Sequence, residues 1–208
     1  MDVSEDLANL NFSRFKEWKI EHTTVNARQA ILAFKGDVYL GLKAETFDKE
    51  DFEFAQKHLR ILSGLYGILR PLDLIEPYRL EMGTKISVGK AKNLYEFWAK
   101  DIVNHLNLEL KQHPTPILLN LASQEYFKVV AVKNLSFPII HIDFKEIKNG
   151  KPITVGFFSK KARGMMSSFI IRQKINQLEA LKSFNEEKYE FNQHLSTENQ
   201  WIFTRDSE

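Results

Sequence analysis

The apolar residues of this chain follow two spacings, one typical of helices and one typical of strands. Short, continuous apolar runs at residues 30–34 and 117–121 predict two buried strands, because polar or turn-forming residues bound each run. Apolar residues three or four positions apart predict helices over 48–62, 94–106 and 160–174. This alternation of helices and strands indicates an α/β or α+β fold, in which helices flank a mixed sheet.

Two further stretches predict pairs of strands. The alternating apolar runs at residues 139–144 and 153–158 are separated by an Asn-Gly pair at 149–150, which is a strong β-hairpin signal. Residues 189–192 and 201–204 carry aromatic and apolar side chains that predict a late pair of edge strands. Together with the two buried runs, these strands make up the predicted mixed sheet.

Composition narrows the class of protein without naming a partner. The 208 residues contain no internal repeat, no low-complexity segment and no linker-like stretch, so we expect one compact domain over residues 1–208. The absence of cysteine excludes disulfides, thiolate zinc sites, cysteine-bound iron–sulfur clusters and a cysteine nucleophile. Because 29 bases stand against 27 acids, any interaction with nucleic acid must rest on local charge.

The N-terminus and the hydropathy pattern predict where the protein works. Residues 1–12 are acidic and contain no long apolar run, so they do not resemble a signal peptide. No apolar stretch approaches the roughly 20 residues that are needed to span a bilayer. We therefore expect a soluble, cytoplasmic protein that has no membrane partner.

Residues 159–174 carry the most informative local charge. This segment has five bases and no acid, namely Lys160, Lys161, Arg163, Arg172 and Lys174. On a helix, its apolar residues share one face, whereas the opposite face combines bases with the small residues Gly164 and Ser167, which allow another backbone to approach. Phosphate is the natural partner, as nucleic-acid backbone or as a small phosphorylated ligand. The alternative is a solvated basic face on a core helix.

A second candidate lies between Leu59 and Pro71. A predicted helix ends there, Gly64 and Gly67 turn the chain, and an apolar segment resumes, with Arg70 beyond it. Helix-hairpin-helix modules bind duplex DNA through such a turn, because glycine lets backbone N–H groups approach phosphate oxygens. A glycine-rich helix end followed by a loop would give the same pattern.

A third candidate combines Asn120, Ser123 and Glu125 at a predicted strand-to-helix turn. Open sheets tend to bind ligands at such turns, where an Asn orients a ligand and a Glu accepts a proton. Ser123 and Glu125 also fit an ordinary helix start, and no hydrolase elbow is present. Arg79 lies two residues from Glu81 and either serves the site or pairs with that acid. The histidines have no metal-site spacing, so we expect neither a metal nor a cofactor.

Five stretches of the chain, in order, resemble the YaaA family of bacterial proteins that are linked to resistance to peroxide stress. They are residues 26–39, 62–73, 77–83, 120–128 and 160–164. The resemblance implies a cytosolic protein that protects against hydrogen peroxide, by limiting free intracellular iron. It also implies a family-specific α/β fold with a helix-hairpin-helix element and a basic cleft that binds duplex or distorted DNA. No settled enzymatic reaction comes with the family.

The resemblance also assigns residues. It makes Gly64, Leu65, Tyr66 and Gly67 the hairpin, and it makes Lys160, Lys161 and Arg163 bases of the cleft. The resemblance also implies that typical members carry a longer N-terminal segment than this sequence, with an additional strand. If that strand belongs to the main sheet, we expect its neighbour to be an exposed sheet edge.

Three functional hypotheses follow. The first is a non-enzymatic stress protein that binds DNA phosphates without reading sequence. Its contacts are the residues of the 64–67 turn together with Arg70, Arg79, Lys160, Lys161, Arg163 and Arg172. The second is an enzyme or binding protein for a small anionic ligand at the same cleft, with Asn120, Ser123 and Glu125 as catalytic candidates. The third is direct sequestration of iron, which the scattered carboxylates and histidines disfavour. The sequence leaves the oligomeric state open.

Overall fold

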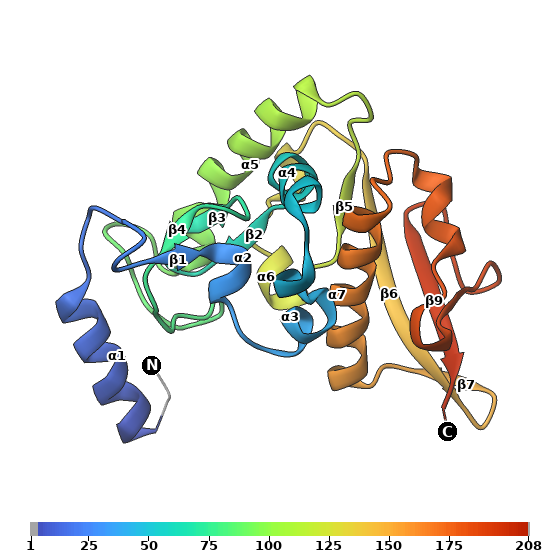
Figure 1. Ribbon diagram of the computed structural model, residues 1–208, viewed down its shortest axis with the longest axis horizontal. Coiled ribbons are helices and arrows are strands. Elements are labelled where there is room, and N and C mark those ends of the chain that lie inside the picture. The colour runs from blue at the N-terminus through green and yellow to red at the C-terminus, as the bar shows by residue number, and fades with distance from the viewer. Residues whose placement is uncertain (1–3, 208) are drawn as a thin grey trace. The chain divides into compact units, whose positions relative to one another are not determined.

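The computed structural model describes residues 4–207, which pack as two compact units. The first unit comprises the described residues of Met1–Phe34, Gln56–Leu106 and Gln124–Leu135. The second comprises Lys35–Ala55, Asn107–Ser123 and the described residues of Ser136–Glu208. Helices and a mixed sheet occur as predicted, which confirms the α/β class (Figure 1). The single domain over residues 1–208 stays a prediction.

The first unit contains short strands and helices. It holds α1 (Glu5–Glu17), β1 (Arg28–Gln29), α2 (Ala30–Ala33), β2 (Ile61–Ser63), β3 (Gly67–Leu69), β4 (Leu74–Ile75), α6 (Gln124–Phe127) and the 3-10 turn η2 (Val132–Asn134). Strand β1 pairs antiparallel with β4, and β2 pairs antiparallel with β3. Helices α4 (Lys49–His58) and α5 (Leu94–Gln112) each have residues in both units.

The predicted strand at residues 30–34 is wrong. Ala30 and Ile31 are buried and the other side chains of the run are half-buried, but the backbone closes a single helical turn, in which the Phe34 N–H donates to the Ala30 carbonyl. The strand pairing is limited to Arg28–Gln29, and the N–H groups of Ala30 and Ile31 donate to the Asp73 and Pro71 carbonyls. A short apolar run does not distinguish a buried strand from a buried helical turn.

The helix predicted over 48–62 begins close to its expected start but ends at His58. Beyond it, β2 and β3 form a β-hairpin in which Ser63 pairs with Gly67. The glycine turn therefore joins two strands, and the helix-hairpin-helix is not confirmed. Both glycines are required by packing. A Cβ on Gly64 would overlap the Leu80 carbonyl, and Gly67 has a φ of +74° with the Trp98 ring 2.7 Å from the position of a Cβ.

The second unit is built on a mixed sheet of five strands. It holds α3 (Asp37–Leu42), η1 (Ala44–Thr46), β5 (Leu118–Asn120), β6 (Ile139–Lys148), β7 (Lys151–Ile153), α7 (Gly156–Arg172), η3 (Leu178–Ser183), η4 (Glu186–Lys188), β8 (Glu190–Phe191) and β9 (Gln200–Asp206). The strand order is β5-β6-β9-β8, and β7 also pairs with β6. Strands β5, β6 and β9 are parallel, whereas β7 and β8 pair antiparallel with their neighbours.

The Asn-Gly hairpin is confirmed, with a correction to its second strand. Asn149 and Gly150 adopt φ angles of +52° and +72°, as a tight turn between twisted strands requires. The returning strand is only Lys151–Ile153, because Gly156 already begins α7. Residues 153–158 are therefore mostly helical or irregular. The late strands also pair as predicted, but β9 is an interior strand that lies between β6 and β8.

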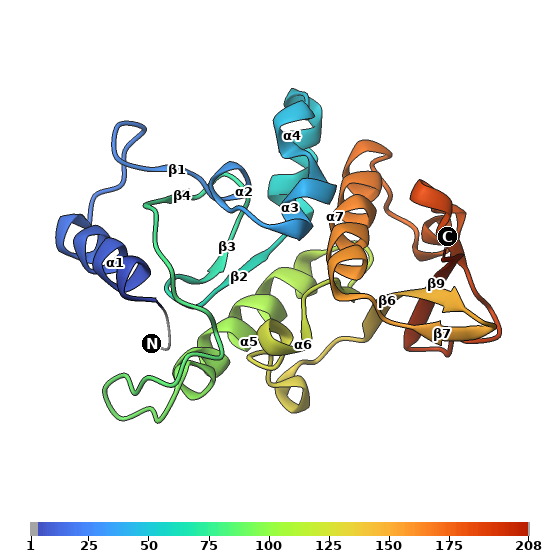
Figure 2. The same cartoon turned by 90° about the horizontal axis from the view of Figure 1, so that it is seen from below.

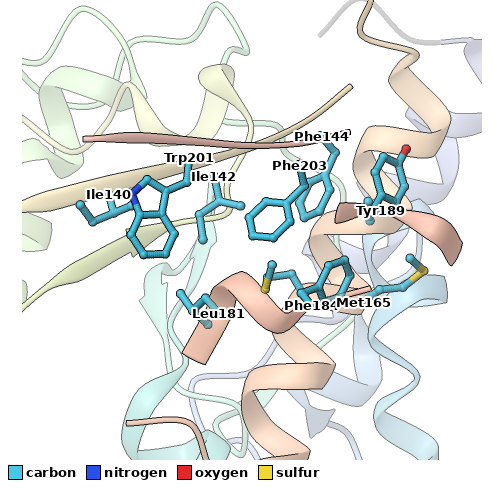
Figure 3. Packing of buried hydrophobic residues seen from close by; sticks show 11 residues of the cluster. Ile140, Ile142, Phe144, Met165, Leu181, Phe184, Tyr189, Trp201 and Phe203 are labelled. Carbon is cyan, nitrogen blue, oxygen red and sulfur yellow. The ribbon is translucent and has the colours of Figure 1, made fainter. Parts of the chain in front are cut away.

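Helix α7 packs its two faces against different partners. Ala162, Met165 and Met166 are buried against the sheet, in a core that contains Phe144 and Phe203 (Figure 3). This confirms the predicted apolar face. On another side, Gly164 approaches α3 so closely that a Cβ would overlap the Val38 carbonyl oxygen. Figure 2 shows α3 beside α7. The small residues of the basic face thus admit a second backbone, as predicted.

This contact gives a stability prediction with a control on the same helix. Gly164→Ala should destabilise the protein by about 1–3 kcal/mol or more, because the added methyl group meets backbone that cannot rotate away. Gly156→Ala should change stability by less than about 0.5 kcal/mol, since no atom lies within 4 Å of the added carbon. Urea unfolding of both variants measures the difference. Equal stability of the two variants would contradict the close α3–α7 contact.

Candidate functional site

The sequence-predicted site residues fall into both units. Gly64, Leu65, Tyr66, Gly67, Arg70, Arg79 and Glu125 belong to the first unit. Asn120, Ser123, Lys160, Lys161, Arg163 and Arg172 belong to the second. The surroundings of each group decide which side chains are already engaged by the protein and which are available to a ligand.

The glycine turn is held firmly within the first unit. The Tyr66 N–H donates to Ser63 Oγ at 2.9 Å, so this backbone donor is satisfied inside the turn. Trp98 Nε1 donates to the Gly64 carbonyl at 3.0 Å. Gly64 and Gly67 are themselves buried. Packing against the rest of the unit therefore accounts for the glycines without a ligand.

Arg70 and Arg79, the two candidate arginines of the first unit, differ in their surroundings. Arg79 Nε lies 3.2 Å from Glu81 Oε1, so these residues pair as their spacing suggested. The Arg70 side chain is exposed, and its backbone N–H donates to Asp73 Oδ2 at 2.7 Å. Part of the positive charge of Arg79 is thus neutralised within the protein.

A hydroxyl pair that no sequence pattern predicted lies beside the turn. Ser63 Oγ and the Tyr78 hydroxyl are 2.6 Å apart, and burial raises the pKa of Tyr78 well above its ordinary value. Burial also raises the pKa of Tyr126 to about 12, with help from the nearby charges of Glu125 and Glu81. Both phenols therefore stay protonated at neutral pH, and neither is a ready general base.

Glu125 and Asn120 are both occupied by local hydrogen bonds. Glu125 Oε1 accepts the Gly83 N–H at 3.0 Å, which holds the 81–84 turn. Asn120 Oδ1 accepts the Ala122 N–H at 3.0 Å, so its Nδ2 faces His141 Nδ1, also at 3.0 Å. Because Nδ1 must accept this bond, the neutral imidazole carries its proton on Nε2. Ser123 directly precedes α6, where a helix start was predicted.

Most bases of α7 pair with acids from other segments. Lys160 Nζ lies 3.7 Å from Asp37 Oδ2, and Lys161 pairs with Glu187. Arg172 binds Thr46 and lies 4.0 Å from Asp51, and Lys174, just beyond the helix, also pairs with Asp51. The basic face predicted from the sequence is therefore largely compensated by charges that come from distant parts of the chain.

Asp51 is the most buried of these acids. Burial raises the pKa of its carboxyl, but the hydrogen bond from Lys174 Nζ, the reciprocal cap with Asp48 and the charges of Lys174 and Arg172 outweigh this effect. The net pKa lies below the ordinary Asp value. Asp51 thus stays ionised at neutral pH and ties the start of α4 to the end of α7.

Arg163 differs from its neighbours on α7. Its Nε donates to the Ser159 carbonyl at 3.3 Å, and among residues 4–207 its terminal nitrogens have no hydrogen-bond or ion-pair partner. The side chain is half-buried, and burial lowers the pKa of its guanidinium while the charge of Asp143 opposes that shift. A partly desolvated cation without a close acid is the kind of group that an added anion stabilises.

The acid-poor stretch is longer than the segment predicted as basic. Residues 145–174 contain eight bases and one acid, Glu146, which is buried and bound by Arg205 at 2.6 Å. Lys148 and Lys151 lie directly opposite each other at the tip of the β6–β7 hairpin, an unfavourable pairing of like charges. Neither makes an ion pair with any described residue. The single acid among eight bases over residues 145–174 was the sequence signal that could have pointed to these two lysines.

The part of the chain that the structure describes contains neither a metal-ligating cluster nor a membrane-spanning helix. No group of three or more His, Cys, Asp or Glu side chains is placed to hold a metal ion. No helix there has both the length and the apolar character to cross a membrane.

The fold defines a mixed α/β protein whose basic hairpin and basic helix follow each other along the chain. The chain matches the family model described as "Peroxide stress protein YaaA" over residues 1–195, and it belongs to that family. It is 53% identical over 206 residues to a "UPF0246 protein" of Cellvibrio japonicus, covering 99% of this chain and 80% of that protein. A "UPF0246 protein" of Saccharophagus degradans is 53% identical over 205 residues, with the same two coverages. The resemblance to the YaaA family is thereby confirmed, as is a role in the response to peroxide.

The ion pairs of Asp51 predict how stability depends on pH. Asp51→Asn should lower the free energy of unfolding at neutral pH by about 1–3 kcal/mol, because Lys174 loses its charged acceptor. Since the folded pKa of Asp51 is depressed, its contribution is fully present above the unfolded pKa of about 3.9 and is lost as pH falls through the lower folded pKa. The stability difference between the variant and the wild type should therefore be smaller near pH 3 than at neutral pH, so the two begin to converge there.

Urea unfolding at neutral pH and near pH 3 measures this convergence. Glu53→Gln is the matched control, since Glu53 is exposed and pairs with Lys49 at 3.8 Å on the surface of the same helix. That variant should follow the wild type at both pH values. An Asp51→Asn variant as stable as the wild type at neutral pH would show that the buried ion pairs contribute nothing.

Proposed function

We propose that this member of the peroxide-stress family binds DNA through phosphate contacts made by Arg163 and nearby lysines of the second unit. The observation that carries the proposal is the guanidinium of Arg163, which is half-buried and whose terminal nitrogens have no partner among the described residues. Phosphate oxygens match the planar fork of arginine, and a partly desolvated site strengthens the bond. A backbone phosphate would supply the anion that the protein itself does not.

Neighbouring lysines extend this contact. Lys160 is about half exposed and its pair with Asp37 is long, so a phosphate can replace that acid at little cost. Lys148 and Lys151 repel each other across the hairpin, and a polyanion would relieve the repulsion. Lys161 and Arg172 lie on the same helix and add to the local positive potential, although Glu187 and Asp51 hold them.

In this proposal the first unit makes phosphate contacts of its own. The exposed Arg70 and the partly neutralised Arg79 contribute positive charge there, whereas the Tyr66 N–H of the 64–67 turn is already bound by Ser63 Oγ. Because these contacts are to phosphates, binding should depend little on DNA sequence and strongly on salt. Distorted DNA would bind for the same reason as duplex DNA, since both present phosphates.

We connect this binding to the peroxide response through iron. The proposed setting is the cytoplasm, where ferrous iron converts hydrogen peroxide to hydroxyl radicals that damage DNA. A protein that binds DNA and limits free iron would reduce that damage. The iron link rests on family resemblance alone, and the proposed DNA contact does not depend on it.

A small phosphorylated ligand is the second candidate. A single half-buried arginine binds one phosphate group of a small molecule as well as it binds a phosphate of DNA. In the same unit, the hydrogen-bonded side chains of Asn120 and His141 lie on neighbouring parallel strands. This candidate predicts saturable binding of a phosphorylated metabolite with a weak dependence on salt, because one phosphate displaces few counterions.

The test is fluorescence anisotropy of labelled duplex DNA titrated with the protein over a salt series. Wild-type affinity should fall steeply as salt rises. Arg163→Gln and Lys151→Glu should each weaken binding, by roughly tenfold for Arg163→Gln if one charged hydrogen bond is lost. Each should also make the salt slope shallower by about 1.

Lys49→Glu is the control, because it makes the same charge change as Lys151→Glu on exposed α4 of the same unit. Its affinity should stay close to that of the wild type. Unchanged affinity of a folded Arg163→Gln variant would overturn the proposed contact. If DNA fails to bind and a phosphorylated metabolite binds through Arg163, the second candidate replaces the first.

A further inference from the structure

A protein of the peroxide response is exposed to oxidising radicals, and this chain has no thiol to intercept them. It contains no cysteine, and Met82, Met165 and Met166 are all buried. Among residues 4–207, the exposed side chains that a one-electron oxidant attacks are therefore mainly aromatic. Among the tryptophans, Trp18 is 36% exposed, whereas Trp201 is 5% exposed and Trp98 is half-buried.

Trp18 is hydrogen-bonded directly to a tyrosine. Its indole Nε1 donates to the Tyr66 hydroxyl oxygen over 3.0 Å, although the two residues are 48 positions apart. His22 packs edge-on against both rings, with centroid separations of 5.4 Å from Trp18 and 5.8 Å from Tyr66. The exposed indole and the half-buried phenol thus share one hydrogen bond and one aromatic neighbour.

The Tyr66 oxygen is surrounded by donors. Besides the indole N–H, it accepts the Glu76 backbone N–H at 3.2 Å. Two donors of this kind stabilise an electron-rich oxygen, and they need not move when the phenol loses its hydrogen atom. The surroundings of Tyr66 are therefore arranged for a phenoxyl radical as well as for a phenol.

We propose that Trp18 and Tyr66 form a hole-transfer pair, which moves an oxidation from the exposed indole to the half-buried phenol. A one-electron oxidising radical takes an electron from Trp18, and the Nε1 proton leaves to water. The Tyr66 hydroxyl then turns its hydrogen toward the deprotonated indolyl nitrogen, which accepts that hydrogen atom over the 3.0 Å that separates the two heavy atoms. In sum, the radical gains one electron, one proton is released, and a Tyr66 phenoxyl radical remains beside an intact Trp18.

Tyr78, the aromatic neighbour of Tyr66, is a poor acceptor for the oxidation, so the transfer ends at Tyr66. The Tyr78 ring lies 5.4 Å from that of Tyr66, but its hydroxyl is bonded to Ser63 Oγ in a buried setting that disfavours loss of the proton. The oxidation is therefore retained at Tyr66. The transfer uses neither Arg163 nor the lysines of the β6–β7 hairpin, so it can be tested apart from the DNA contact proposed for the second unit.

The experiment is pulse radiolysis of the DNA-free protein with azidyl radical, which oxidises indoles by one electron. Wild-type protein should show indolyl absorbance that decays as phenoxyl absorbance rises, with a first-order rate that does not depend on protein concentration. Tyr66→Phe and Trp18→Phe should each remove this phase. Tyr95→Phe, a change of the same size elsewhere in the first unit, should keep it.

A second measurement tests the transfer by the amount of oxidised Trp18, and circular dichroism controls for folding. Mass spectrometry after a fixed dose of hydroxyl radical should find severalfold more oxidation at Trp18 in Tyr66→Phe than in the wild type, with oxidation at Trp98 unchanged. Circular dichroism establishes that the variants are folded. A fast phase that persists in Tyr66→Phe, or that scales with protein concentration, would overturn the proposal, as would equal oxidation of Trp18 in both proteins.

Discussion

The close approach of α3 and α7 is the constraint on which the second unit depends. Gly41 and Gly164 let the two helix backbones meet where any larger residue would overlap a carbonyl oxygen. This contact fixes the rotation of α7, so that Ala162, Met165 and Met166 must face the sheet. It also brings Asp37, at the start of α3, within reach of Lys160. One steric requirement thus decides both the packing of the helix and the surroundings of its first bases.

Charge compensation then separates bases that hold the fold from bases that can serve a ligand. Asp51 and Glu187 engage Arg172, Lys174 and Lys161, and these pairs join elements that are distant in sequence. Among the described residues Arg163 makes no such ion pair, although its guanidinium is partly desolvated and the charge of Asp143 acts on it. The bases of residues 159–174 look equivalent in sequence, but in the described part of the structure most of them are paired with acids and Arg163 is not. An external anion would therefore gain most binding energy at Arg163.

The two units differ in the kind of side chain that could act during peroxide stress. The second unit presents cations, which suit phosphates, whereas the first unit contains Trp18, His22 and Tyr66 in a contiguous aromatic group. Because the chain contains no cysteine, no thiol within it competes with that aromatic group for oxidising radicals. The proposed phosphate contact of Arg163 and the proposed radical transfer between Trp18 and Tyr66 use different residues, so each can be tested without the other.

The sequence by itself determined those features that depend on neighbouring residues. The Asn149-Gly150 turn, the helix that contains residues 94–106, the apolar face of α7 and the local excess of bases all follow from short-range pattern and composition. Five motifs in order also identified the family. Tertiary structure decided the rest. Residues 30–33 became a helical turn, and the 64–67 turn became part of a β-hairpin that packs against Leu80 and Trp98. Lys174 pairs with Asp51 across 123 positions, and a spacing rule cannot reveal a partner so far along the chain, because only folding brings the two together.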